Sequence, residues 1–140
     1  MEGRFLLFSA AGEGFACDLQ EVAEVMEPQA SFPIPLAPPH FTGLINFHGT
    51  LTALVDLALY LGRHGQGGAG KVLVLDGKRA GLALQVDGVS AIVTREAITG
   101  ESPGDDPLTE ARLETEHGTF RLLRIEALLS GLELGLEQGL

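Results

Sequence analysis

The sequence has a single cysteine, no tryptophan and one tyrosine among its 140 residues, and it is poor in lysine and arginine. One cysteine, Cys17, excludes an internal disulfide and cannot supply a cysteine cluster for zinc. Nine basic residues stand against 19 acidic ones, which gives a formal net charge of -10. Nucleic acid and anionic membrane surfaces both require clustered cations on the protein. We therefore expect neither as a partner.

Long hydrophobic runs are also missing. The apolar run nearest the N-terminus, residues 5–8, is far shorter than the hydrophobic region of a signal peptide. No stretch approaches the ~20 apolar residues that a membrane-spanning helix needs, so we expect a cytoplasmic protein without membrane insertion. A hydrophobic fraction of 45% and a charged fraction of 20% are typical of a globular chain. The length predicts one domain, residues 1–140.

Two parts of the chain resemble each other. Residues 14–19 (GFACDL) align with residues 81–86 (GLALQV) at an offset of 67. Residues 48–62 align with residues 117–131 at an offset of 69, and seven of these fifteen positions are identical. We interpret this as an approximate internal repeat, with chance similarity between two β-rich halves as the alternative. The two repeats span 3–62 and 71–131, and the glycine-rich linker spans 63–70.

Short strands dominate each half. Residues 3–8 and 15–19 are predicted to form one hairpin, and residues 71–75 and 80–86 a second. Residues 20–26 fit either a short helix or an extended edge strand. Sheets this small expose their edges unless they close, so the prediction is mainly β: two small pseudo-symmetric barrels side by side. Whether the two subdomains exchange strands stays open.

Three further features complete this outline. Five prolines lie between residues 28 and 39, which exclude a helix or a central strand there and indicate a crossing or a loop. Phe32, Phe41 and Phe47 are expected in the core or as anchors of that crossing. An apolar helical pattern from Ile125 predicts a terminal helix.

The order of several motifs resembles the CheW-like domain family from about Arg4 to Leu129. These motifs read FLLF, GFACDLQEVAEV, PxPxxPPxFxGLINxxGxxxxLVDL and GKRxGLxLQVDGVSAI. The resemblance implies two five-stranded SH3-like β-barrel subdomains with short helices. It also implies a non-enzymatic adaptor in chemotaxis signal transduction, part of a two-component system. Such an adaptor couples the cytoplasmic tips of chemoreceptors (methyl-accepting proteins) to the regulatory domain of a CheA-type histidine kinase. No catalytic residue, metal or cofactor is implied.

The resemblance also assigns protein-binding positions. Val22 and Val25 match apolar contact positions, and Glu24 matches an acidic position that pairs with a motif arginine. Gly43, Asn46 and Gly49 match the family's G-x-x-N-x-R-G turn. Gly81, Asp87 and Gly88 match the hairpin and the D-G-V turn of the second half. The complete set of expected protein-binding residues is Val22, Glu24, Val25, Gly43, Asn46, His48, Gly49, Gly81, Asp87 and Gly88.

One of these positions departs from the family motif. In the G-x-x-N-x-R-G turn, this chain has His48 where the family has arginine. A guanidinium is always charged and can form two parallel hydrogen bonds with a carboxylate, whereas an imidazole is shorter and mostly neutral at pH 7. We therefore expect the pair with Glu24 to be weakened or absent. The resulting hypothesis is an adaptor that binds receptors but couples poorly, or in a pH-dependent way, to the kinase; a tolerated variant is the alternative.

A function of another class, a small β-barrel nucleotide-binding module or enzyme, would depend on GQGGAG (65–70) followed by Lys71. Phosphate motifs of this type need a helix after the loop, and a P-loop needs serine or threonine after the lysine. A strand is predicted here instead, and Val72 follows the lysine. Cys17 with a distant histidine could form a nucleophile pair, but its alternation with Phe15 and Leu19 favours a place in a barrel core.

Overall fold

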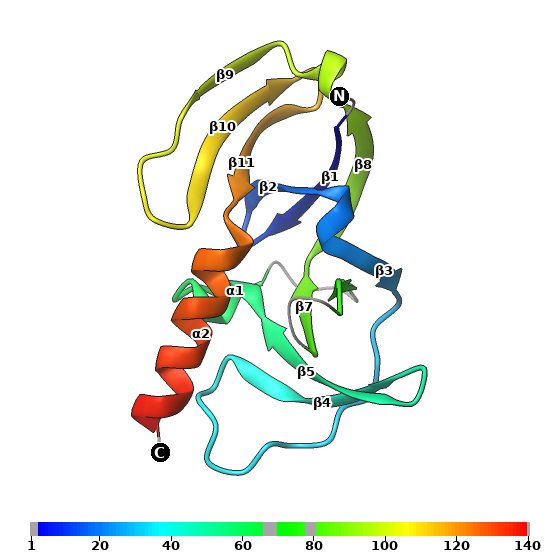
Figure 1. Cartoon of the computed structure of the whole chain (residues 1–140), viewed down its shortest axis with the longest axis vertical. Coiled ribbons are helices and arrows are strands. Elements are labelled where there is room, and N and C mark those ends of the chain that lie inside the picture. The colour runs from blue at the N-terminus through cyan, green and yellow to red at the C-terminus, as the bar shows by residue number, and fades with distance from the viewer. Residues whose placement is uncertain (1–2, 66–69, 78–80, 140) are drawn as a thin grey trace.

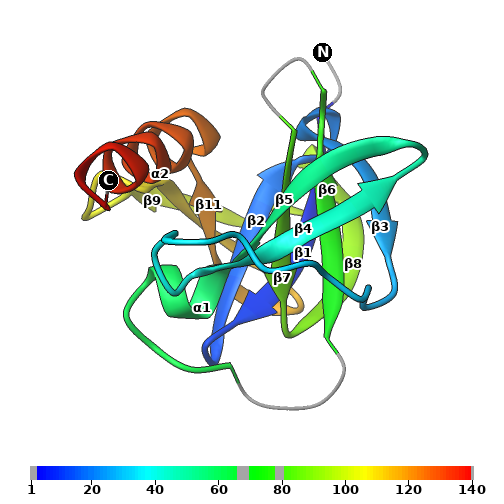
Figure 2. The same cartoon turned by 90° about the horizontal axis from the view of Figure 1, so that it is seen from below.

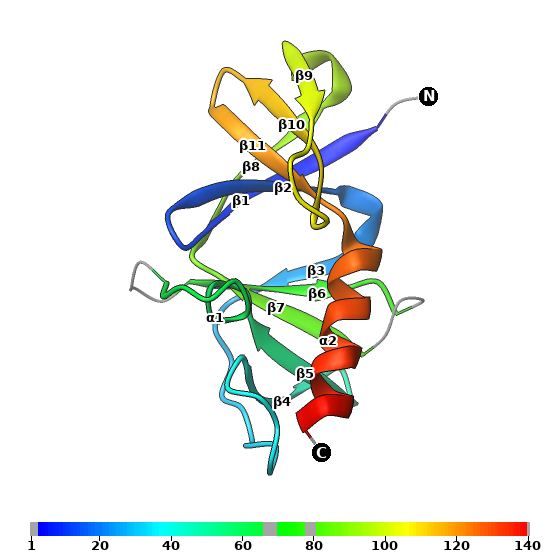
Figure 3. The ribbon, with the colours of Figure 1, turned by 90° about the vertical axis from the view of Figure 1, so that its left-hand side faces the viewer.

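The computed structural model is mainly β and describes residues 3–65, 70–77 and 81–139, the last six of these by their backbone alone. In this part of the chain the strands form one six-stranded and one five-stranded sheet, called sheet A and sheet B. Figures 1 and 3 show the two sheets stacked along the long axis, with sheet A uppermost. The mainly β architecture expected from the sequence is therefore confirmed.

Sheet A has the order β8-β1-β2-β11-β10-β9. Its strands are β1 (Arg4–Ala10), β2 (Glu13–Asp18), β8 (Gly88–Thr94), β9 (Gly100–Pro103), β10 (Thr109–Thr115) and β11 (Gly118–Leu123). Sheet B has the order β3-β6-β7-β5-β4. Its strands are β3 (Val22–Met26), β4 (Phe41–Phe47), β5 (Thr50–Asp56), β6 (Lys71–Leu75) and β7 (Leu82–Val86).

The two hairpins near the start of each half lie in the sheet of the other half. The first hairpin, β1–β2, lies between β8 and β11, and the later hairpin, β6–β7, lies between β3 and β5. Strands β2 and β11 pair in parallel, and so do β5 and β7. Corresponding strands thus follow the same order in both sheets. This correspondence supports the predicted internal repeat, which itself stays a prediction.

Three apolar clusters form the core of the described chain, and one of them lies between the two sheets. The central core lies between the sheets and contains Phe8, Phe15 and Cys17 from sheet A and Leu73 and Leu84 from sheet B. A second cluster fills the curl of sheet A, and a third fills the curl of sheet B. Strands β1, β2, β6 and β7 contribute to clusters on both of their faces, which explains why their sequences are nearly continuous runs of apolar residues. Cys17 therefore packs between the sheets rather than inside a barrel.

In the described part of the chain, two short 3-10 helices and helix α1 connect strands, and helix α2 follows the last strand. The 3-10 helices span Leu19–Glu21 and Arg95–Ala97. Helix α1 (Leu57–Tyr60) begins after Asp56, whose carboxylate accepts a hydrogen bond from the Leu59 N–H at 3.1 Å, a standard N-cap. Helix α2 (Ile125–Gly139) runs beside sheet B and supplies Leu128 and Leu132 to the central core. The terminal helix predicted from Ile125 is confirmed.

Several finer expectations need correction. No closed barrel is present in the described chain, because each sheet curls around its own cluster while its edge strands stay unpaired with each other. Of the two alternatives for residues 20–26, the edge strand is confirmed for residues 22–26, so Val22 and Val25 do not share the face of a helix. Phe41 is buried, but the Phe32 side chain is 68% exposed, and Phe32 anchors the crossing only through its backbone. Residues 66–69 of the expected linker lie outside the described residues.

Candidate partner-binding surface

The turn between β4 and β5 presents the residues of the G-x-x-N-x-R-G motif. Phe47 pairs with Thr50, so the loop consists of His48 and Gly49 alone. Both have positive φ angles, +48° and +89°, as a two-residue hairpin turn of type I′ requires. The carboxamide oxygen of Asn46 accepts a hydrogen bond from the Gly49 N–H at 2.7 Å. This turn therefore holds His48 at the tip of the hairpin in a fixed direction.

His48 reaches across to the opposite edge of sheet B. Its Nε2 atom lies 3.1 Å from Oε1 of Glu24 on β3. In the sheet order β3-β6-β7-β5-β4, the hairpin tip and β3 belong to opposite ends, so this contact joins the two edges of the curled sheet. The pair that we expected to be weakened or absent is present, and the imidazole makes the contact with one nitrogen. Both side chains remain accessible, with 71% and 42% of their area exposed.

The two valines of β3 have different environments. Val22 pairs with Leu75 and packs, half-buried, against the central core. Val25 is 41% exposed and lies next to Glu24 in the strand. A partner can therefore contact Val25 directly, whereas Val22 contributes to the fold as well.

The glycine of the motif has a packing role. Gly43 is buried in β4, and a Cβ atom there would lie 2.6 Å from the carbonyl oxygen of Phe32. Phe32 and Leu44 exchange two backbone hydrogen bonds of 2.9 and 2.7 Å. Only glycine allows the proline-rich crossing to approach β4 this closely. Gly43 thus allows the crossing to pack closely against β4, the strand that leads into the His48 turn.

Three of the expected binding residues, Gly81, Asp87 and Gly88, belong to the second half of the chain and lie outside the His48 turn. Gly81 is exposed, and its carbonyl accepts a hydrogen bond from the Ala53 N–H on β5 at 2.9 Å. Next to it, Leu51 is 66% exposed, an apolar neighbour that the sequence reasoning missed. Asp87 and Gly88 lie where the chain passes from sheet B to sheet A.

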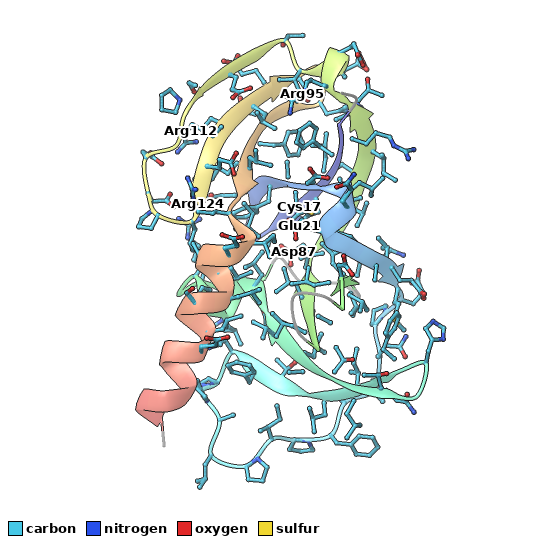
Figure 4. All side chains as sticks on the ribbon, in the orientation of Figure 1. Cys17, Glu21, Asp87, Arg95, Arg112 and Arg124 are labelled. Carbon is cyan, nitrogen blue, oxygen red and sulfur yellow. The ribbon has the colours of Figure 1, made fainter. Side chains whose placement is uncertain are left out.

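Asp87 makes hydrogen bonds that connect the two sheets. Its Oδ2 atom accepts a hydrogen bond from the Ala11 N–H at 3.0 Å, and its own N–H donates to the Ser9 carbonyl at 2.8 Å. Ala11 and Gly12 form the tight turn between β1 and β2, both with positive φ. Figure 4 shows Asp87 with Cys17 and Glu21 at the level where the two sheets meet. Asp87 therefore contributes to the fold, and its expected role in protein binding stays a prediction.

A family model for the CheW-like domain matches residues 4–133. The chain belongs to the CheW-like domain family. The scaffolding protein TtCheW from Thermoanaerobacter tengcongensis has a similar structure, with a TM-score of 0.76 and 22% sequence identity over 89% of this chain and 90% of that one. A comparison with curated protein sequences finds no match. Members of the CheW-like family are adaptor and scaffold proteins, which act by holding other proteins together.

One charged network of this CheW-like domain was not predicted. Arg121 on β11 donates to Thr109 at 3.0 Å and to Asp106 at 2.7 Å, and it also pairs with Glu13. Glu13 accepts a second hydrogen bond from Arg63, which follows α1. Burial acts to raise the pKa of the Glu13 carboxyl, but hydrogen bonds from Arg121 and Arg63 outweigh it and lower the pKa. The only sequence signal was an arginine inside an apolar strand, which needs a partner when it is half-buried.

The single thiol of the CheW-like domain is inaccessible. Cys17 is buried in the central core, and burial raises its pKa to about 12, with smaller contributions from Glu21 and Asp18. A protonated, buried thiol does not act as a nucleophile. The nucleophile pair considered from the sequence is therefore not supported at Cys17.

The glycine-rich motif continues as a strand. Lys71 begins β6, and its ammonium group pairs with Glu27. A phosphate-binding loop leads into a helix N-terminus, whereas Gly70 leads directly into β6. Among the side chains that the structure describes, in residues 3–65, 70–77 and 81–133, no group of three or more metal-binding residues could hold an ion. None of the described helices combines the length and the hydropathy that a membrane span needs.

Proposed function

We propose that this chain is a cytoplasmic, non-enzymatic adaptor that couples the tips of chemoreceptors to the regulatory domain of a CheA-type histidine kinase. The observation that carries the proposal is the family match over residues 4–133, nearly the whole chain. Coupling of this kind needs two partner surfaces on one small rigid body. Two sheets packed on a shared central core supply such a body.

The surface around the His48 turn is our candidate for the kinase side. Glu24 and His48 keep the contact that the family's acidic residue and arginine make, which supports kinase coupling over an adaptor that lacks it. Val25 and Leu51 are exposed apolar side chains. Val25 follows Glu24 in β3, and Leu51 lies in β5 just after the His48 turn. A few apolar anchors inside a polar rim are typical of transient signalling contacts.

The experiment is a pair of separate binding assays with purified full-length protein. One uses a receptor cytoplasmic tip and the other a kinase regulatory domain, each immobilised. We expect the chain to bind both. Glu24→Gln should weaken kinase binding and leave receptor binding in place, because it removes one charge from the exposed pair. Binding of neither partner would refute the proposal, and binding of the receptor alone would favour the receptor-only adaptor.

A matched control lies in the same protein. Asp105 is 65% exposed, pairs only with Arg112 among the described contacts, and lies in the loop between β9 and β10 on sheet A. Asp105→Asn changes the same charge at a distant exposed position. It should leave both bindings unchanged. An equal loss in Asp105→Asn would show that net charge, rather than the His48 turn, governs the contact.

A further inference from the structure

The last residue of the proline-rich crossing, His40 in residues 28–40, joins the crossing to α1. The centroid of its ring lies 5.0 Å from that of Phe41 and 5.1 Å from that of Tyr60 on α1, and it meets the Tyr60 ring edge to face. Its carbonyl oxygen accepts a hydrogen bond of 2.8 Å from the N–H of Asp56, the residue before α1. In Figure 2 the crossing reaches β4 beside α1. His40 thus attaches the end of the crossing through both its backbone and its ring.

One nitrogen of the His40 imidazole is buried without a hydrogen-bond partner. The residue as a whole is half-buried, yet its Nε2 atom is shielded from solvent and makes no hydrogen bond with any described residue. A neutral imidazole tolerates this position, because it can carry its proton on Nδ1 and leave only a lone pair on Nε2. An imidazolium has an N–H group at both nitrogens. Protonation would therefore leave a charged donor buried and unsatisfied.

The groups packed around this ring do not compensate a positive charge. From α1, Tyr60 contributes an aromatic ring whose hydroxyl group lies against Gly131 of α2. From β5, the Asp56 carboxylate accepts the hydrogen bond that caps α1. Residues 28–39 carry no charged side chain. Burial is the cause that lowers the pKa of the His40 imidazole below its ordinary value of 6.5, and no charged neighbour among the described residues adds to that shift.

We propose that His40 is a pH-sensitive attachment point of the crossing: a proton on its imidazole displaces the ring from Tyr60 and releases residues 35–40 from α1. The earlier part of the crossing stays in place, because Phe32 is hydrogen-bonded to β4 and Ile34 packs against the central core. Release is therefore local and leaves the two sheets intact. The segment is attached at neutral pH and free at mildly acidic pH, the range in which histidine changes its charge.

The first test is chemical denaturation of the full chain from about pH 7.5 to about pH 5.5. The unfolded chain protonates His40 at its ordinary pKa of 6.5, whereas the folded chain protonates it only at lower pH. The stabilisation by the neutral ring is thus fully present above 6.5 and is lost as the pH falls to the lowered value of the folded state. The unfolding equilibrium constant of the wild type should accordingly rise, by up to roughly tenfold, over this range.

Two variants assign this rise to one histidine. His40→Phe keeps an aromatic ring beside Tyr60 and takes up no proton, so its unfolding constant should rise less than that of the wild type. His64→Gln removes an exposed imidazole and should keep the wild-type rise. An equal rise in the wild type and in His40→Phe, or a rise that disappears in His64→Gln instead, overturns the proposal.

The second test distinguishes local release from a general loss of stability. Amide hydrogen exchange is measured at both pH values and expressed as protection factors, which correct for the intrinsic pH dependence of exchange. The Asp56 N–H, which donates to the His40 carbonyl, should lose more protection at acidic pH than the amides of β6 inside sheet B. In His40→Phe this difference should vanish. Equal losses at Asp56 and in β6 of the wild type contradict local release. Neither test involves receptor or kinase, so failure here leaves the proposed adaptor function to its own assays.

Discussion

Nε2 of His48 and Oε1 of Glu24 lie 3.1 Å apart and connect the two edges of a five-stranded sheet. The hairpin turn fixes the imidazole from one side, and β3 supplies the carboxylate from the other. An arginine at position 48 could add a second hydrogen bond and a permanent charge. The pair therefore joins the two edges of sheet B and is also part of the candidate kinase-binding surface.

His48→Arg should strengthen kinase binding. A guanidinium carries a permanent charge and can form two parallel hydrogen bonds with the Glu24 carboxylate, whereas the imidazole makes the contact with one nitrogen. Isothermal titration calorimetry of both proteins with the kinase regulatory domain measures the two affinities. Equal affinities would show that the histidine is a neutral replacement.

Val25→Arg and Val22→Arg should separate binding from folding. Val25 is exposed, so an arginine there should abolish partner binding and leave the thermal unfolding curve in place. Val22 packs against the central core, so the same change there should destabilise the protein by about 1–3 kcal/mol. Differential scanning fluorimetry together with the two binding assays distinguishes them. A stability loss at Val25 would place it in the core instead.

Arg121→Met should destabilise the protein by about 1–3 kcal/mol at neutral pH, because it leaves Asp106 without its cation and Glu13 with Arg63 alone. The pKa of Asp106 is lowered: burial opposes this, but hydrogen bonds from Thr109 and Leu108 and the charge of Arg121 prevail. Both carboxyl pKa values, Glu13 included, are lowered on folding.

The loss of stability at acid pH depends on the lowered pKa values of Glu13 and Asp106. Carboxyl groups with lowered pKa values stabilise the fold fully above their ordinary values, 4.5 for Glu13 and 3.8 for Asp106. This stabilisation is lost as the pH falls through the lower values of the folded state. The free energy of unfolding, measured with urea from neutral to acid pH, should therefore fall less steeply with decreasing pH in Arg121→Met than in the wild type. Arg112→Met, which breaks an exposed pair, should keep the wild-type slope.

Gly131→Ala should loosen the contact between α1 and α2. A Cβ atom at position 131 would lie 2.0 Å from the Tyr60 hydroxyl oxygen, so one of the two must move. We expect a loss of about 1–3 kcal/mol. Tyr60→Phe removes the clashing oxygen and should rescue most of this loss when combined with Gly131→Ala. Additive effects of the two changes in chemical denaturation would contradict the contact.

Cys17 should react with a thiol reagent only after unfolding. It is buried and its pKa is raised to about 12, so the thiolate is scarce at neutral pH. The labelling rate in native buffer should match the rate of global unfolding, and full reaction should appear in denaturant. Rapid labelling of the native protein would show that the sheets separate easily.

The alternation of large and small side chains predicted the hairpin strands, because it reports directly which face is buried. Phe15 and Cys17 were expected on one face, and both lie in the central core. The same signal was ambiguous for residues 20–26, since valines three apart fit a helix as well as an irregular strand. The sequence pattern also could not indicate that each hairpin packs into the other half's sheet, which depends on long-range pairing.

In the candidate site as well, local sequence predicts some features, and others depend on long-range packing. The turn residues Asn46 and Gly49 have local functions that a short motif reveals. The reach of His48 to Glu24 depends on how strongly the sheet curls, and no local pattern encodes that curvature. Arg121 gathers partners from positions 13, 106 and 109, so its network exists only after the chain has folded.

The placement of hairpin β1–β2 beside β11, and of β6–β7 beside β5, makes each sheet a joint product of both halves of the sequence. A chain divided between the halves would leave two fragments, each lacking the central strands of its own sheet. Neither fragment should form a stable sheet by itself, yet a mixture of the two could reassemble the whole. Folding should accordingly be a single cooperative event, and damage to one sheet should be felt in the other.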